Sequence, residues 1–467
     1  MPKTTENTII YAMTDNFMII NDPSLSGNER LAALRKTGKN RDLSQNTGEI
    51  NNHIHTIYSY SPYTPSMAAY KAWESGLKAA GSVDHDSIAA ADEMLESCAV
   101  LGIGGCAGFE VRVSFKKDAF GKASVFSARK LNNPDSEGIA YMTVQGIPRS
   151  FIQSAALFLA PIREERLKRT KAMAVSANAL LREADIQEID FEKDIYRCSK
   201  YNEGGEITER HLLAAIAGTI INKYGKGPRL TDGLKQKFDV TIPPKISSLL
   251  CDPDNPHYLY DLLGVLKSDI LPLIFIQPDE KECISAQTVT SFADSICAIP
   301  SYAYLGDVGE SPTGDKKAEK FEDDFIDELF VELSRLKYKA VTYMPPRNTR
   351  DQLLNVQQLC RKHGFMEISG VDINSSRQSF NCPEVLNDES RHLIDTTWAL
   401  IAHERLASVD RRYGLFSADN PLASLGLKDR LAAFAFFGKK LDLNNPGESA
   451  AQIAIEIDKG NLNWRNV

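Results

Sequence analysis

The chain has 467 residues, of which 43% are hydrophobic and 25% are charged, and its formal net charge is -8 at pH 7. These values are ordinary for a folded protein and exclude a long disordered chain; they also disfavour nucleic acid as a main partner, because they leave no broad basic surface for a phosphate backbone. Apolar runs fall short of the roughly 20 residues that span a bilayer, and the first residues lack a signal-peptide pattern, so we expect a cytoplasmic protein that binds no membrane.

The length predicts about two to three structural units. Residues 1–47 are polar and irregular, and we expect an N-terminal extension packed on the outside. Over 48–155 short strands alternate with helices, which predicts β-α-β units and a parallel sheet or barrel. The elements expected there are a strand into His55, a helix over 66–80, a turn at Asp84, a helix over 89–100 and a strand that ends at Glu110.

The pattern changes to long helices over 156–250, where apolar residues recur at three-four spacing, and this indicates an all-helical insertion. The barrel pattern resumes over 251–385. The elements expected there are strands over 270–276, 299–305 and 340–343, helices over 286–296, 317–336 and 350–363, and a last strand that leads into Asp372. Residues 386–467 are predicted to form a C-terminal helical extension.

Residue types that bind metals recur along the barrel segments. His53 and His55 are two apart on a predicted strand, so their side chains point to the same face and can reach one ion. Asp84, His85, Asp86, Glu110 and Asp372 follow at predicted strand ends. Imidazoles combined with carboxylates suit Mn, Fe or Zn, so the pattern predicts a transition-metal site for hydrolysis. The plainer alternatives are hydrogen-bonded strand histidines and solvent-exposed carboxylates, with Asp84 and Asp86 in supporting roles.

Read together, these motifs resemble the PHP superfamily, named for polymerase and histidinol phosphatase, over about 48–385. The likeness is greatest to its stand-alone phosphoesterase branch, in which a helical insertion carries an Arg-rich helix similar to Arg163-Glu164-Glu165-Arg166 and an Arg-His element similar to Arg210-His211. The resemblance implies a distorted (β/α)7 barrel with metals at the C-terminal mouth of its strands. It also implies phosphoester hydrolysis by a metal-activated water.

The resemblance implies that His53, His55, Glu110 and Asp372 surround one metal and that His85 serves a neighbouring one. This chain departs from the family pattern at Tyr60, Tyr141, Tyr304 and Asn374, where the family has Asp or His ligands. The number of bound ions therefore stays open between one and three, and we expect one complete site. We hypothesise that Asp307 supplies a replacement carboxylate and that the tyrosines hydrogen-bond a substrate phosphate.

Four basic residues are candidates for binding substrate phosphate: Arg210, His211, Arg347 and Arg377. The alternatives are an ordinary helix face for the first two and surface salt bridges for the last two. For Arg163 and Arg166 a solvated helix face is the favoured interpretation. The predicted function is a metal-dependent phosphoesterase of a small phosphorylated metabolite or nucleotide. Two rivals stay open, a degenerate barrel that only binds or scaffolds and another metal-assisted hydrolysis such as amide cleavage.

Overall fold

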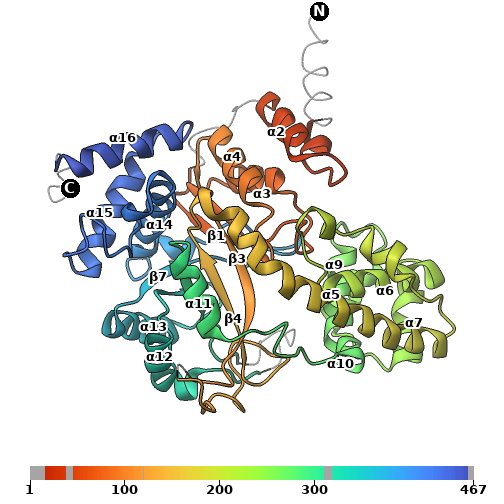
Figure 1. Ribbon diagram of the computed structural model, residues 1–467. Helices are drawn as coiled ribbons and strands as arrows, with labels where there is room; N and C mark the ends of the chain where they lie inside the picture. Colours follow the sequence, from red (N-terminus) through yellow and green to blue (C-terminus); the bar gives the residue numbers. More distant parts are fainter. Residues whose placement is uncertain (1–15, 38–45, 119, 310–317, 461–467) are drawn as a thin grey trace, which may run out of the picture.

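The computed structural model describes residues 16–37, 46–118, 120–309 and 318–460. At its centre lies a seven-stranded sheet whose strands follow one another in chain order, visible in the middle of Figure 1. The strands are β1 (Ile50–Ile54), β2 (Ala79–His85), β3 (Gly104–Ser114), β4 (Ile139–Gln145), β5 (Ile299–Ala303), β6 (Ala340–Tyr343) and β7 (Met366–Ser369).

The sheet curls so that its first and last strands meet. The His55 N–H donates to the Ile373 carbonyl at 2.9 Å, and the Ile373 N–H donates to the His53 carbonyl at 3.1 Å. Gly370 makes this approach possible, because a Cβ there would lie 2.6 Å from the Cβ of His53. The predicted α/β fold with a distorted seven-stranded barrel is confirmed.

The direction of one strand differs from the expected parallel sheet. β4 pairs antiparallel with both β3 and β5, while the other strand pairs are parallel. β3 and β4 follow each other without an intervening helix, and an antiparallel pair needs no helical crossover to join it. The strand expected to end at Glu110 therefore continues to Ser114, with Glu110 in its interior.

Helices surround the sheet and form two further groups. The helices are α2 (Gly27–Lys36), α3 (Pro65–Glu74), α4 (Ala91–Leu101), α5 (Ile152–Glu183), α6 (Glu209–Tyr224), α7 (Pro228–Phe238), α8 (Pro244–Cys251), α9 (Tyr258–Asp269), α10 (Leu271–Ile274), α11 (Ala286–Ser295), α12 (Ile326–Arg335), α13 (Arg350–His363), α14 (His392–Val409), α15 (Leu427–Lys440) and α16 (Pro446–Asp458). Short 3₁₀ or π turns are η2 (Arg149–Phe151), η3 (Phe191–Tyr196), η4 (Tyr201–Glu203), η5 (Asp323–Phe325), η6 (Pro383–Leu386) and η7 (Arg411–Tyr413).

Figure 1 shows α5 running from the barrel into a helical group formed by α6 to α10, while α14 to α16 lie on the opposite side of the sheet. Among the described residues, no helix is both long and apolar enough to cross a membrane.

Some predicted bounds hold because local caps set them. The helix expected over 350–363 has those limits: Thr349 and Gln352 form a capping box at its start, and Gly364 ends it in the left-handed conformation. The strand expected over 270–276 is wrong, because this segment forms α10, and Ile270, Leu271 and Ile274 pack into the core of the helical insertion. The core of this helical group thus extends to Ile274. The end of the insertion at residue 250 stays a prediction.

Three other predicted elements are shifted. The helix expected over 66–80 ends at Glu74, and β2 begins at Ala79. Asp84 lies within β2 rather than in a turn. The acidic helix expected over 317–336 is described only from 318; a 3₁₀ turn precedes α12, which begins at Ile326. Residues 1–15 and 38–45 of the expected N-terminal extension lie outside the described residues.

The C-terminal helices close one end of the barrel. Buried residues of α14 pack against the first residues of five strands, Ile50, Ala79, Ile299, Ala340 and Met366. On the same side, a Glu404 carboxylate oxygen accepts the Ala107 N–H at 2.8 Å. Since α14 covers the N-terminal ends of these strands, the mouth at their C-terminal ends is left for a site.

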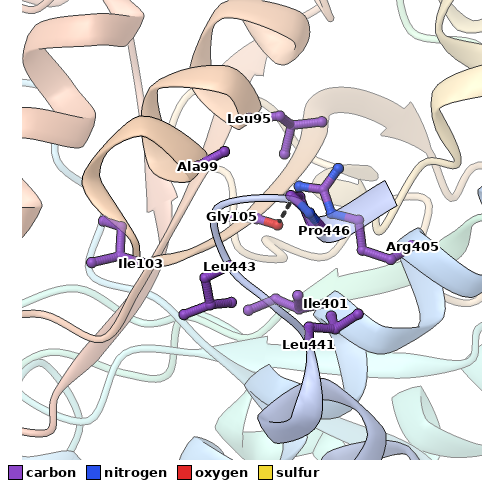
Figure 2. A pocket seen from close by; sticks show the side chains of 9 residues that line it. All are labelled: Leu95, Ala99, Ile103, Gly105, Ile401, Arg405, Leu441, Leu443 and Pro446. Atoms are coloured by element: carbon purple, nitrogen blue, oxygen red, sulfur yellow. Dashed lines mark hydrogen bonds between the residues drawn. The ribbon is translucent and has the colours of Figure 1, made fainter. Parts of the chain in front are cut away.

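The packing of this extension against α4 leaves little free space. Figure 2 shows a pocket between them in which Arg405 donates to the Gly105 carbonyl, at 3.2 Å. Its volume is about 10 Å³, room for no more than one water molecule. We therefore place the site elsewhere.

Candidate metal centre

The ends of β1, β2 and β7, together with the interior of β3, bring the predicted ligands to the C-terminal mouth of the barrel. His53 and His55 lie at the end of β1, and His85 is the last residue of β2. Glu110 is the register partner of His85 on β3, and Asp372 follows β7. The four-residue cluster expected from the sequence, together with His85, is thus brought together in space.

The possible ligand atoms fall into two groups that share His55. One contains His53, His55 and Asp372, the other His55, His85 and Glu110, and within each group the ligand atoms lie within 4.8 Å of one another. The two Nε2 atoms of His53 and His55 are 3.3 Å apart, and His55 Nε2 is 3.2 Å from Asp372 Oδ1. Two atoms bound at about 2.1 Å to one tetrahedral ion lie roughly 3.4 Å apart, so this group fits a single cation.

In the second group, His85 Nδ1 lies 3.0 Å from Glu110 Oε2. The other oxygen of Glu110, Oε1, lies 3.9 Å from Nε2 of His53, a member of the first group. Glu110 therefore stands between His53 and His85. The donor set of imidazole nitrogens and carboxylate oxygens suits a transition metal.

Burial sets the protonation of the cluster. It lowers the pKa of His53 and takes the pKa of His85 well below its ordinary value, so both rings are neutral at pH 7. Burial also lowers the pKa of His55, but Asp372 outweighs it and the net shift is upward. For Asp372 burial raises the pKa, yet His55 holds it below the ordinary range. His53, His85 and Asp372 are therefore in the forms that bind metals, whereas a metal that binds His55 has to displace the proton that Asp372 favours there.

A hydrogen-bonded chain orients His55. Ser59 Oγ donates to Asp84 Oδ1 at 2.5 Å, so it accepts from His55 Nδ1 at 3.1 Å. Thr56 also donates to Asp84, through its N–H and its hydroxyl, both at 2.7 Å. With the proton held on Nδ1, the lone pair of His55 sits on Nε2 and faces the cluster. Asp84 thus supports the cluster from behind.

The hydrogen bonds from His55 through Ser59 to Asp84 can be tested by substituting Ser59. We expect Ser59→Ala to weaken Mn²⁺ binding by about 10–100-fold, the usual effect of losing a partner that orients a ligand. Competition with a fluorescent chelator measures the affinity, and ¹⁵N NMR reports the His55 tautomer. Ser61→Ala is the matched control, since the Ser61 hydroxyl is buried nearby without a hydrogen-bond partner among the described residues. Equal affinities for both variants would contradict the assigned role.

Asp86 also lies behind the cluster. Its N–H donates to the Glu110 carbonyl at 2.7 Å, and its carboxylate pairs with Arg166 NH1 at 2.6 Å. Arg166 is 2% exposed, so the solvated helix face favoured for it is wrong. Arg163 instead donates to the carbonyls of Tyr201 and Gly205. Arg166 thus links the insertion to the barrel, whereas the contacts of Arg163 lie within the insertion.

A cavity of about 270 Å³ opens over the cluster. His53, His85, Glu110 and Asp372 line one part of it. Arg210 from α6 and Lys267 from α9 reach the same cavity from the helical insertion. An anionic substrate would thus meet two cations and the ligand cluster together.

The other predicted phosphate-binding residues are placed differently. His211 accepts the Thr208 N–H at 3.0 Å as part of a capping box, and burial lowers its pKa to about 3. Arg377 pairs with Asp261 of the insertion at 2.6 Å, which is the salt-bridge alternative. Arg347 donates to the Leu305 carbonyl at 3.2 Å. Arg210 alone of the four is a lining residue of the cavity.

The tyrosines at the altered ligand positions have different surroundings. Tyr141 lines the cavity, with its ring centroid 5.7 Å from that of His85. Tyr60 packs edge-on against His211, and the Tyr304 hydroxyl, although Tyr304 lines the cavity, donates to Asp323 at 2.6 Å. Asp307 pairs with Lys320 at 2.6 Å and is not brought to the cluster, so we do not retain it as a replacement ligand.

Among the cavity residues that sequence reasoning missed are Lys267 and Asn132. Lys267 is a single lysine near the end of an amphipathic helix, where a basic residue is ordinary, so its position carried no signal of a site. Asn132 donates to the Tyr141 carbonyl at 2.8 Å and accepts the Tyr141 N–H at 2.7 Å. Asn132 does not directly follow a predicted strand, so the sequence contained no signal for it. Its place in the cavity depends on how the β3–β4 connection folds.

Comparison with known proteins gives weak likenesses. No protein-family model matches the chain, and no curated protein matches it. One similar solved structure is an amidohydrolase from Chromobacterium violaceum with bound sulfate and no metal; identity is 16%, the TM-score is 0.43, and the match covers 72% of this chain and 90% of that one. Another is described as a candidate metal-dependent phosphoesterase from Bifidobacterium adolescentis, with 15% identity, a TM-score of 0.45 and coverage of 74% and 96%. Because both TM-scores lie below 0.5, neither likeness carries weight for the site.

Proposed function

We propose that this protein is a metal-dependent phosphoesterase of the PHP type that hydrolyses a small phosphorylated metabolite or nucleotide. One observation supports the proposal above others: a His-carboxylate cluster lies in the same 270 Å³ cavity as Arg210 and Lys267. Ligands for a cation and cations for an anion, side by side in a small cavity, suit a phosphate group bound against a metal.

His53, His55 and Asp372 would hold the principal ion, and Glu110 with His85 would complete or extend the site. We propose one Mn, Fe or Zn ion as resident, since the two ligand groups share His55, and the Nε2 lone pair of one imidazole binds a single ion. Such an ion, when bound, supplies a water of lowered pKa and neutralises phosphate charge.

The residues of the insertion would bind the phosphate. Two of the five N–H donors of Arg210 bind Asn374, so the other three would be left for phosphate oxygens, and Lys267 adds a point charge in the same cavity. Burial raises the pKa of the Tyr141 hydroxyl, so Tyr141 keeps its proton at neutral pH. The proton has no acceptor among the described residues, and Tyr141 would donate it to a substrate oxygen.

The second candidate is a catalytically degenerate barrel that binds without turnover. Two altered positions favour it: the Tyr304 hydroxyl is held by Asp323, and the Asn374 amide is held within the protein. Neither is free to replace a lost ligand. A protein that takes up metal but hydrolyses no phosphoester would match this candidate.

The decisive experiment is a phosphate-release assay on a panel of small phosphorylated metabolites and nucleotides. We expect protein supplied with Mn²⁺ to release phosphate from at least one member, and EDTA to remove the activity. Elemental analysis of the same preparation measures metal content. Failure to release phosphate despite a bound ion would refute the enzyme, and failure to bind any ion would refute the site.

A further inference from the structure

The Asn374 side chain has a fixed orientation beside the cluster. Its Nδ2 donates to Asp372 Oδ1 at 2.7 Å, the same oxygen that lies 3.2 Å from His55 Nε2. Its Oδ1 accepts from Arg210 NH2 at 2.8 Å. Because a donor faces one side and a carboxylate the other, the amide can be oriented in only one way.

This orientation removes Asn374 from the possible ligands. The amide nitrogen has no lone pair to offer, and the amide oxygen faces the Arg210 guanidinium instead of the cluster. Arg210 also donates through NH1 to the Asn374 carbonyl at 2.8 Å. Its guanidinium thus grips both the side chain and the backbone of Asn374.

We propose that Arg210 is a positioning residue of the metal centre, acting through Asn374. Arg210 fixes the Asn374 amide, and the amide fixes the Asp372 carboxylate toward the ion. Since Arg210 belongs to α6 of the insertion and Asp372 follows β7 of the barrel, the ligand geometry depends on how the insertion is docked. This inference rests on the proposed metal site and adds a role that phosphate binding alone does not give to Arg210.

Charge and positioning predict opposite signs, which makes the inference testable. Removing a cation near a metal site strengthens the binding of a positive ion by Coulomb's law. Removing a group that orients a ligand weakens it, by about 10–100-fold. Lys267 is the matched control, because it lines the same cavity from the same insertion but has no hydrogen bond to Asn374 or Asp372 among the described residues.

The experiment measures Mn²⁺ affinity without substrate, by competition with a fluorescent chelator. We expect Arg210→Met and Asn374→Ala each to bind Mn²⁺ about 10–100-fold more weakly, Arg210→Lys to be intermediate, and Lys267→Met to be unchanged or tighter. The double variant Arg210→Met with Asn374→Ala should be no weaker than the weaker single variant, because both act along one path. Thermal melts by circular dichroism confirm that each variant is folded.

Two results would overturn the inference alone: Arg210→Met that binds Mn²⁺ as tightly as the wild type, or losses that add fully in the double variant. Should Arg210→Met fail to fold, the Asn374→Ala variant decides by the same criterion of affinity. A wild-type protein that binds no divalent ion would overturn the proposed function together with this inference.

Discussion

We expect His55→Ala to remove the bound metal and to lower phosphate release by more than the ~10–100-fold typical of an orienting partner. His55 is the residue that both ligand groups share. Its loss therefore leaves His53 with Asp372 on one side and His85 with Glu110 on the other. Elemental analysis and the phosphate-release assay measure the two effects, and Mn²⁺ should no longer raise the melting temperature.

His363→Ala is the control for this variant. His363 ends α13 and contacts Phe330 and Phe365 rather than the cluster, so metal content and activity should stay at the wild-type level. An active, metal-loaded His55→Ala protein would show that the chemistry lies elsewhere.

The second large effect concerns stability. Arg166→Met should destabilise the protein by about 3–5 kcal/mol, the cost of leaving buried charges without their partner. Arg166 pairs with Asp86 and with Glu209, each at 2.6 Å, and it is almost fully buried. Urea unfolding monitored by circular dichroism measures the loss.

Lys168→Met provides the comparison on the same helix. Lys168 pairs with Glu164 and Glu165, but its side chain is 57% exposed, and exposed pairs contribute little to stability. If Arg166→Met and Lys168→Met unfolded at the same urea concentration, the buried network would not hold the insertion to the barrel.

That network extends further than one pair. Arg169 pairs with Glu209 at 2.5 Å and with Glu282 at 2.6 Å, and Arg112 of β3 also pairs with Glu209, at 3.2 Å. These charges lie between α5, α6 and the barrel. Since Arg210 and Lys267 also come from the insertion, the network that docks the insertion also places the two cavity cations.

Local patterns predicted a large part of the fold. The His-x-His spacing placed two side chains on one strand face, and the two Nε2 atoms do lie 3.3 Å apart. Thr349 and Gly364 set the limits of α13 as expected. The register of His85 with Glu110 follows from neighbouring parallel strands. Each of these features depends on residues close in sequence or on the common edge of a sheet.

Predictions failed where packing outweighs local preference. The apolar run at 270–276 reads as a strand, but its residues fill a helical core. Arg166 was predicted to lie on an exposed helix face, but its helix packs against α6, and the Arg166 guanidinium pairs there with Glu209. Arg377 follows a strand end and was a candidate for phosphate binding, yet its guanidinium pairs with Asp261, 116 positions away in sequence. Periodicity contains no information about such distant partners.

The sequence by itself determined the ligand types, their spacing and the barrel that brings strand ends to one mouth, because side-chain alternation and caps act over a few residues. Only the tertiary structure decided that β4 runs antiparallel, that α14 covers the opposite end, and that Arg210 and Lys267 rather than Arg377 face the cavity. Those outcomes depend on long-range packing and on pairing of buried charges, which are properties of the folded chain.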